Sequence, residues 1–417
     1  MAWVAWAAAA WVRSATEVVR SRVARLDALV LTAGIWFLAK FLRYAFPPLF
    51  PTLAVEYGVS NADLGVAFTA LMLAYAAMQL PSGVLADRFG GWRVVTAGAV
   101  LAALSSLAIA APVVLGAPLP FLVLVAAMVV VGVGTGMHKT VAVPLLSRIY
   151  TRKTGRALGV LDTFGAFGGV VAPVAVVAAT TGVLAAVVDW PAVFLAAGLT
   201  VLAFALRVPA RVGAAGDGDP ESGSSLAAYA GLFADRDVAA FVAVTVLFSF
   251  TYNGAVAFLP TYLVDAAELS EATAGSLYAA LFAVSVVQVA TGGASDRVGR
   301  LPVVGATLAL AAVGLAVVVA YPTAPVLLVG AGVVAFGLGS HGFRPVRGAY
   351  LVELVPDDVA GGALGVVRTA IMGVGAVAPA TVGVLAERFG FQLAFGALLA
   401  ALVGALLALA AVVSLAE

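Results

Sequence analysis

A series of apolar runs, each long enough to cross a lipid bilayer, constrains this chain more than any other feature. A spanning helix needs about 20 mainly apolar residues. Twelve runs meet that length, at 27–47, 64–86, 93–115, 119–146, 156–184, 190–208, 238–263, 272–293, 301–320, 325–349, 361–385 and 390–413. The pattern predicts an all-α membrane protein with twelve transmembrane helices, which has the lipid bilayer as its solvent.

The composition supports this interpretation. Only 10% of the residues are charged and 63% are hydrophobic, whereas soluble domains carry about 25% charged residues. There is no cysteine, so disulfides and thiolate metal sites are excluded. The sequence also lacks a metal-ligand cluster and an HExxH-type motif. We expect no cofactor, no bound metal, no nucleic-acid partner and no enzymatic activity.

A polar stretch, "ARVGAAGDGDPESGSS" at 210–225, divides the spans into two sets of six. Its Gly, Asp and Ser content is typical of a flexible linker. We therefore predict four parts: an N-terminal segment 1–26, a six-helix bundle 27–209, a linker 210–237 and a second six-helix bundle 238–417.

The positive charges lie at one set of helix ends. The loops there hold Arg13, Arg20, Arg22, Arg25, Arg88, Arg93, Arg148, Arg152, Lys153, Arg156, Arg207, Arg211, Arg297 and Arg300. The opposite loops are acidic, with Arg388 as the one cation. Short loops rich in Lys and Arg stay in the cytoplasm. We expect a multi-pass protein of the inner (cytoplasmic) membrane with the linker, the N-terminal segment and both termini in the cytoplasm.

The two sets of spans repeat each other in sequence. "GVLADRFGG" at 83–91 and "GGASDRVGR" at 292–300 share Asp-Arg and a following glycine at an offset of 209. "GTGMH" at 134–138 matches "GLGSH" at 337–341, and "ALGV" recurs at 157 and 363. A collinear series with little drift in offset indicates an internal duplication of six-span units. The halves would be related by an axis along the membrane normal.

The repeated loop resembles the signature loop of the major facilitator superfamily, and the span count and linker agree with that family. Gly91 and Trp92 depart from the usual basic residues, although Arg93 retains one. The resemblance implies a monomeric transporter and a loop that latches the two bundles in one conformation. The alternative is a tight loop that only marks the cytoplasmic side. The latch residues would be Gly83, Asp87, Arg88, Gly90, Gly293, Asp296, Arg297, Gly299 and Arg300.

Ionisable groups inside the spans are costly in lipid and indicate a functional site. They are Lys40, Arg43, His138, Lys139, Asp162, His341, Arg344, Arg347 and Arg368. By resemblance, spans one, four, seven and ten line the transport cavity, with contributions from five and eleven. The charges fall on these spans, with none on three, six, nine or twelve. This distribution predicts a central polar site with more cations than anions.

In the first span, Lys40, Arg43 and Tyr44 share one helix face before a double proline that ends or kinks the helix. Arginine can hold a carboxylate or phosphate with two hydrogen bonds, and lysine acts as a point charge. We interpret all three as substrate-binding residues. The alternative is that the cations reach toward the outer interface along their apolar stems.

Asp162 and Arg368 occupy equivalent positions in the two halves. They could form a gating ion pair when the cavity closes toward the cytoplasm, or each could pair within its own bundle. Asp162 is also the candidate proton carrier. Arg368 is in addition a candidate for substrate binding.

Four further residues join the predicted binding site. His138 and His341 are either hydrogen-bonded packing residues or functional groups able to exchange a proton. Tyr252 and Asn253 could bind a ligand or could soften a discontinuous helix beside Gly254. Lys139 and Arg344 complete the predicted binding residues.

The sequence predicts a secondary active transporter that moves a small organic anion, such as a carboxylate or a phosphorylated solute, by alternating access. Proton coupling or exchange for another anion would drive it. One alternative is a proton-driven exporter of drug-like amphiphiles, which the buried cations disfavour. Another is a membrane sensor that binds a solute without moving it.

Overall fold

The computed structural model describes residues 27–117, 119–151, 153–181, 185, 188–212, 236–354 and 360–416. Within these ranges, twelve helices are long and apolar enough to cross a membrane, which confirms the twelve spans expected from the sequence. The predicted N-terminal segment 1–26 and most of the predicted linker 210–237 lie outside the described residues.

The first half begins with a helix over 27–44, and a turn at Ala45 separates this helix from α2. It continues as α2 (Phe46–Tyr57), α3 (Asn61–Ala77), α4 (Gln79–Phe89), α5 (Gly91–Ile109), α6 (Ala111–Leu115), α7 (Phe121–Ile149), α8 (Thr154–Thr180) and α9 (Pro191–Val212). The second half contains α11 (Arg236–Asp265), α12 (Glu271–Ala283), the 3-10 turn η3 (Val284–Val286), α13 (Val287–Val298), α14 (Arg300–Ala320), α15 (Val326–Leu354), α16 (Ala360–Phe389) and α17 (Phe391–Ala416).

The double proline changes the first span without ending it. The span runs on to Tyr57, beyond the limit of 47 set from the sequence. A proline falls in the first turn of α2, where its missing N–H is not needed and its fixed φ suits a helix. The prolines therefore start a new helix after the turn at Ala45.

The second span of each half is interrupted at a corresponding depth. In the first half, Met78 separates α3 from α4, and in the second half η3 separates α12 from α13. A glutamine follows each break, Gln79 in the first half and Gln288 in the second. The side chain of Gln79 donates to the carbonyl of Gly136 at 3.3 Å and accepts from the hydroxyl of Thr140 at 2.6 Å, which ties the break to α7.

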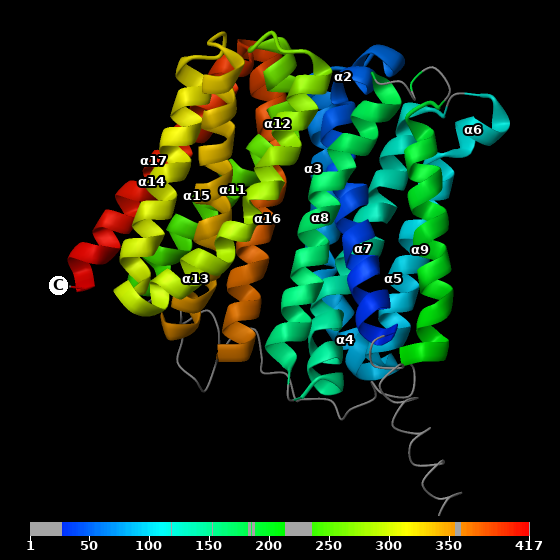
Figure 1. Ribbon diagram of the computed structural model, residues 1–417, viewed down its shortest axis with the longest axis horizontal. Coiled ribbons are helices and arrows are strands. Elements are labelled where there is room, and N and C mark those ends of the chain that lie inside the picture. The colour runs from blue at the N-terminus through cyan, green and yellow to red at the C-terminus, as the bar shows by residue number, and fades with distance from the viewer. Residues whose placement is uncertain are drawn as a thin grey trace, which may run out of the picture.

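The two halves pack tightly against each other at the upper end of Figure 1, where α2, α3 and α8 meet α11, α16 and α12. The N–H of Asn61 donates to the carboxylate of Glu387 at 3.2 Å, and the N–H of Ala380 donates to the hydroxyl of Thr69 at 2.9 Å. The rings of Phe50 and Phe258 lie 5.2 Å apart in the same region.

The face of α8 that meets the second half becomes exposed toward the lower end. Gly169 packs beside Phe282 of α12, and Pro173 lies near Gly275. About two and three turns below Gly169 on the same face, Asp162 and Gly159 are exposed. On η3 and α13, Val286 and Val289 are 76% and 83% exposed. The halves are thus closed at the upper end and separated at the lower end.

Gly65 makes the upper contact possible, because a Cβ at this position would lie 2.5 Å from the carbonyl oxygen of Pro379 in α16. Overpacking of this kind costs about 1–3 kcal/mol. Gly65→Val should therefore shift the protein by about tenfold or more toward states with a wider upper end. The shift is measured as the distance between spin labels attached through Val66→Cys and Val377→Cys, which are exposed positions on α3 and α16.

The matched control is Gly396→Val, since a Cβ there meets no atom within 4 Å. The chain has no native cysteine, so the two labels are the only ones attached. Equal distance distributions for the two valine variants would show that the contact at Gly65 does not hold the upper end closed.

Candidate functional site

Lys40, Arg43 and Tyr44 form a compact group in the last turns of the first helix. The Nζ of Lys40 donates to the hydroxyl of Tyr44 at 3.3 Å and lies 5.1 Å from the centre of the Tyr44 ring. The guanidinium carbon of Arg43 lies 3.8 Å from the centre of the Tyr75 ring in α3. Stacking on an aromatic face is a favourable setting for a buried cation.

Arg43 is the most buried of these cations. It is only 4% exposed, and its Nε and Nη2 atoms have no hydrogen-bond partner among the described residues. A buried charge without a partner costs several kcal/mol. This burial against α3 favours a role in the cavity over a side chain that reaches for the membrane surface.

The second half contributes a similar pair. The guanidinium carbon of Arg344 in α15 lies 4.1 Å from the centre of the Tyr252 ring in α11. Among the described residues, the buried Tyr252 hydroxyl makes no hydrogen bond of normal geometry, with Arg344 and Tyr44 as polar neighbours. His341, one turn before Arg344, is 3% exposed, and within the described part of the chain neither of its ring nitrogens makes a hydrogen bond of normal geometry. Its ring meets Tyr252 and Phe282 edge-on, with centroid distances of 6.0 and 6.1 Å.

Tyr44 lies where the two groups meet. Its ring is 4.5 Å from that of Phe282 in α12, so it touches the opposite half. Lys40, Arg43 and Arg344 all lie within electrostatic range of its hydroxyl group. The structure therefore brings the predicted cations of spans one and ten to one region at the junction of the halves.

Lys139 and Asp162 form an ion pair within the first half. The Nζ of Lys139 lies 2.7 Å from Oδ1 of Asp162, and the two side chains are 27% and 59% exposed. For Asp162, this is the second of the two arrangements considered from the sequence, in which the residue pairs within its own bundle. In the conformation described, the closing pair of Asp162 with Arg368 is absent, and Arg368 is exposed on α16. Its formation in another conformation stays a prediction.

Trp36 connects the ion pair to the central cations and was missed by the sequence analysis. The Nζ atoms of Lys40 and Lys139 each lie 5.4 Å from its ring. His138 stacks on the same indole at 5.9 Å, and its Nε2 lies 3.0 Å from the carbonyl of Thr32. The spacing of Trp36, Lys40 and Tyr44 at i, i+4 and i+8 was the available signal.

Asn253 and Arg347 each lie close to a residue of their own helix. Asn253 donates to the carbonyl of Ser249 at 2.8 Å, one turn earlier in α11. Ser249 in turn donates to the carbonyl of Ile371 in α16 at 2.9 Å. Arg347 lies on α15 with its guanidinium carbon 5.9 Å from the Phe343 ring, and its buried Nε lacks a partner.

Both signature loops lie at the lower end, after α4 and α13 (Figure 1). Each turns at a glycine with positive φ, 89° at Gly90 and 95° at Gly299, a conformation that other residues rarely adopt. Gly83 and Asp87 line a small cavity beside α7, into which Arg148 also extends. Arg88 and Arg297 are exposed.

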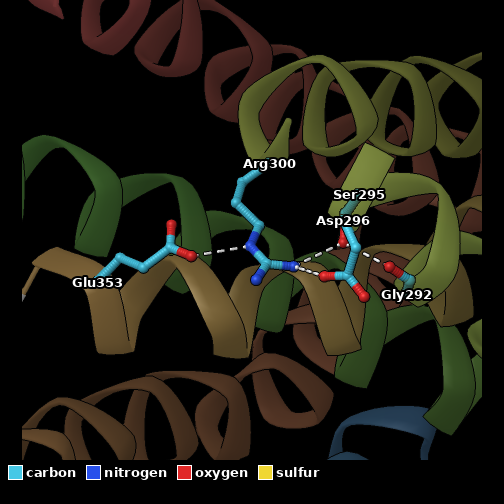
Figure 2. A network of polar contacts seen from close by, with 5 residues as sticks. All are labelled: Gly292, Ser295, Asp296, Arg300 and Glu353. Carbon is cyan, nitrogen blue, oxygen red and sulfur yellow. Dashed lines mark hydrogen bonds and ion pairs between the residues drawn. The ribbon is translucent and has the colours of Figure 1, made fainter. Parts of the chain in front are cut away.

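Figure 2 shows the network around the second loop. Arg300 donates to Asp296 at 2.7 Å, to Ser295 at 2.8 Å and to Glu353 of α15 at 3.0 Å. Ser295 donates to the carbonyl of Gly292 at 2.7 Å. The first loop has glycine at 91 where the second has Arg300, so the duplicated loops are held by different contacts.

Two similar halves of six spans, with cations gathered where the halves meet, form the architecture of a multi-pass membrane transporter. A model of the Major Facilitator Superfamily matches residues 32–288 and 268–416, and the chain belongs to this family. Its members are transporters that bind small-molecule substrates.

Solved structures share the fold at low sequence identity. A bacterial homologue of the human lysosomal transporter Spinster, in an inward-facing and occupied conformation, aligns with a TM-score of 0.73 and 16% identity, over 93% of this chain and 96% of that chain. A nucleoside transporter aligns with a TM-score of 0.77 and 14% identity, over 93% and 99% of the two chains. At this identity the likeness shows the fold alone.

Curated relatives match at higher identity over less of this chain. The probable sulfoacetate transporter of Cupriavidus necator is 30% identical over 177 residues, which cover 41% of this chain and 38% of the relative. The match therefore spans well under half of that relative's length. The probable 4-methylmuconolactone transporter of Cupriavidus pinatubonensis is 24% identical over 87% of this chain and 84% of the relative.

The ring of Tyr75 stabilises the buried Arg43, and this role can be separated from that of its hydroxyl. Tyr75→Leu should lower the free energy of unfolding by about 2 kcal/mol or more, because a desolvated cation loses its aromatic partner. Tyr75→Phe keeps the ring and should cost about 1 kcal/mol or less. The melting temperatures of the two variants in detergent measure the difference. Equal losses would assign the stabilisation to the hydroxyl.

Proposed function

We propose that this protein is a secondary active transporter that moves a small organic anion by alternating access. The observation that carries the proposal is Arg43, which is 4% exposed with two unpartnered guanidinium nitrogens at the junction of the halves. An anionic ligand would satisfy those donors and offset the cost of burying the charge.

The balance of charge around the junction supports an anion. Among the described residues, no carboxylate lies within 4.0 Å of the charged nitrogens of Lys40, Arg43 or Arg344. Asp162 is the one acidic residue among the ionisable groups predicted inside the spans, and it is already paired with Lys139. A cationic solute would meet this uncompensated positive charge at a cost of several kcal/mol.

The conformation fits one state of an alternating-access cycle. The halves are closed at the upper end by contacts such as Asn61 to Glu387, and the facing surface at Asp162 is open at the lower end. With the loops rich in Lys and Arg at the lower end, we place that end in the cytoplasm. The protein would then be open to the cytoplasm, and rocking of the bundles would expose the site to the other side.

The activities named for the two curated relatives are consistent with this substrate class. One is a probable transporter of sulfoacetate and the other of 4-methylmuconolactone. Sulfoacetate is an organic anion with a sulfonate and a carboxylate. It is therefore a suitable probe, together with simple dicarboxylates.

Lys40 and Arg43 should each be needed for uptake. Lys40→Gln and Arg43→Gln should reduce kcat/KM for anion uptake into liposomes by about tenfold or more, because hydrogen bonds to a charged group are worth about 1.5–3 kcal/mol. Uptake of labelled sulfoacetate, malonate and succinate measures the effect. Lys153→Gln is the matched control, since Lys153 is an exposed cation outside the site.

A different result would exclude this function. If neither Lys40→Gln nor Arg43→Gln alters the uptake of any anion that the parent protein transports, the central cations do not bind the substrate. If the parent protein binds and transports cationic dyes in preference to anions, the anion assignment is wrong.

Asp162 is the group through which we propose proton coupling. In the parent protein, a pH gradient should then drive accumulation of the anion above its external concentration. In Asp162→Asn that accumulation should disappear, while exchange of labelled for unlabelled anion continues, because the neutral side chain can no longer carry a proton. Glu268→Gln, an exposed carboxylate in a loop, is the control. Equal accumulation in Asp162→Asn and the parent would exclude coupling through this residue.

A further inference from the structure

We propose that the binding site has two anion seats, one in each half, and that the preferred substrate is a short molecule with two acidic groups. The inference rests on the proposed function and narrows its substrate class. The first seat is built from Lys40 and Arg43, and the second from Arg344 with Tyr252 and His341.

The first seat offers a guanidinium group already fixed in position. The guanidinium carbon of Arg43 lies over the Tyr75 ring at 3.8 Å, and among the described residues its Nε and Nη2 atoms, one edge of the guanidinium fork, have no partner. That edge matches the two oxygens of a carboxylate or sulfonate. Lys40, one turn earlier on the same helix, adds a second positive charge.

The second seat repeats this design with different helices. Arg344 stacks on Tyr252 at 4.1 Å. Around it, within the described residues, lie buried polar atoms that make no hydrogen bond of normal geometry, namely the Tyr252 hydroxyl, both ring nitrogens of His341 and the hydroxyl of Ser340. Native structures rarely leave buried polar atoms unsatisfied, and a cluster of them indicates a missing ligand. These atoms all belong to α11 and α15, so an acidic group bound by Arg43 alone would leave them unsatisfied.

Tyr44 lies between the two seats. Its hydroxyl accepts from Lys40 of the first seat at 3.3 Å, and its ring lies 4.5 Å from that of Phe282. The Phe282 ring in turn lies 6.1 Å from the ring of His341 in the second seat. Two acidic groups joined by a short linker could therefore reach both seats around this side chain. A long linker would have to pass the closed upper contact or extend into the open lower end.

The number of charges leads to the same conclusion. Lys40, Arg43 and Arg344 all lie within electrostatic range of the Tyr44 hydroxyl. In addition, Arg347 lies within electrostatic range of Arg344 and Arg368. One negative charge would leave most of this repulsion in place. Two negative charges from a single ligand would also attract both halves at once, which a rocking transporter needs in order to close around its substrate.

The test compares each dianion with a monoanion of the same size. Sulfoacetate, malonate and succinate are titrated into the purified full-length protein, each beside its carboxylic monoamide, which retains one acidic group. The parent protein should bind at least one dianion about tenfold more tightly than its monoamide. In both Arg43→Gln and Arg344→Gln this preference should fall below about threefold, because each variant leaves one seat without its guanidinium.

Lys153→Gln is the matched control and should keep the full preference. Arg43→Lys and Arg344→Lys retain the charge and lose the fork, so they should give preferences between those of the parent and the glutamine variants. These lysine variants also keep the test valid if a glutamine variant does not fold.

The outcomes distinguish failure of the two-seat arrangement from failure of the proposed anion transport. A parent protein that binds monoamides as tightly as dianions, or a glutamine variant at either arginine that keeps the full preference, would overturn the two-seat arrangement and leave anion transport in place. If the parent protein neither binds nor transports any dianion or monoamide, the proposed function itself fails.

Discussion

Positive charge held at the junction of the two halves, with no carboxylate of the described residues paired to it, is the constraint on which the rest of the structure depends. Ionisable groups inside a bilayer are costly even when water reaches them. The chain reduces that cost by stacking Arg43 on Tyr75 and Arg344 on Tyr252, and by sharing the Trp36 ring between two lysines. Aromatic faces lower the cost of the cations and leave their hydrogen-bond donors available, which a carboxylate partner would not.

The duplicated helices provide the frame that brings these charges together and lets them move. In both halves the second span breaks near its middle and its lower part ends in a glycine turn, so the two units have the same shape. The upper contact depends on small residues that let α3 and α16 approach closely, as at Gly65. Contacts of that kind are strong when closed and lost over a small separation, as the proposed alternating-access cycle requires.

Much of this arrangement could be predicted from the sequence, because lipid imposes simple rules. Spans of about 20 apolar residues, the repeat and the signature loops identified the fold. The convergence of Lys40, Arg43 and Arg344 followed from knowing which spans line the cavity. Trp36 and Tyr75 were not identified, since an aromatic residue in an apolar span has no distinguishing mark until its neighbours are known. The C-terminal end of the first span was also misjudged, because two prolines can begin a helix as well as end one.

The duplication kept the shape of the halves and let their chemistry diverge. Positions 162 and 368 are equivalent, yet one is aspartate and the other arginine, and Arg300 stands where the first half has glycine at 91. His138 bonds to Thr32 in a packed setting, whereas its equivalent His341 meets the rings of Tyr252 and Phe282 edge-on. In the proposed cycle, the shared backbone shape would let the halves move alike, and the different side chains would give each half its own contacts with a ligand. The Arg344 and Tyr252 pair of the second half would then complement the Arg43 and Tyr75 pair of the first, with His341 in a setting that His138 does not share.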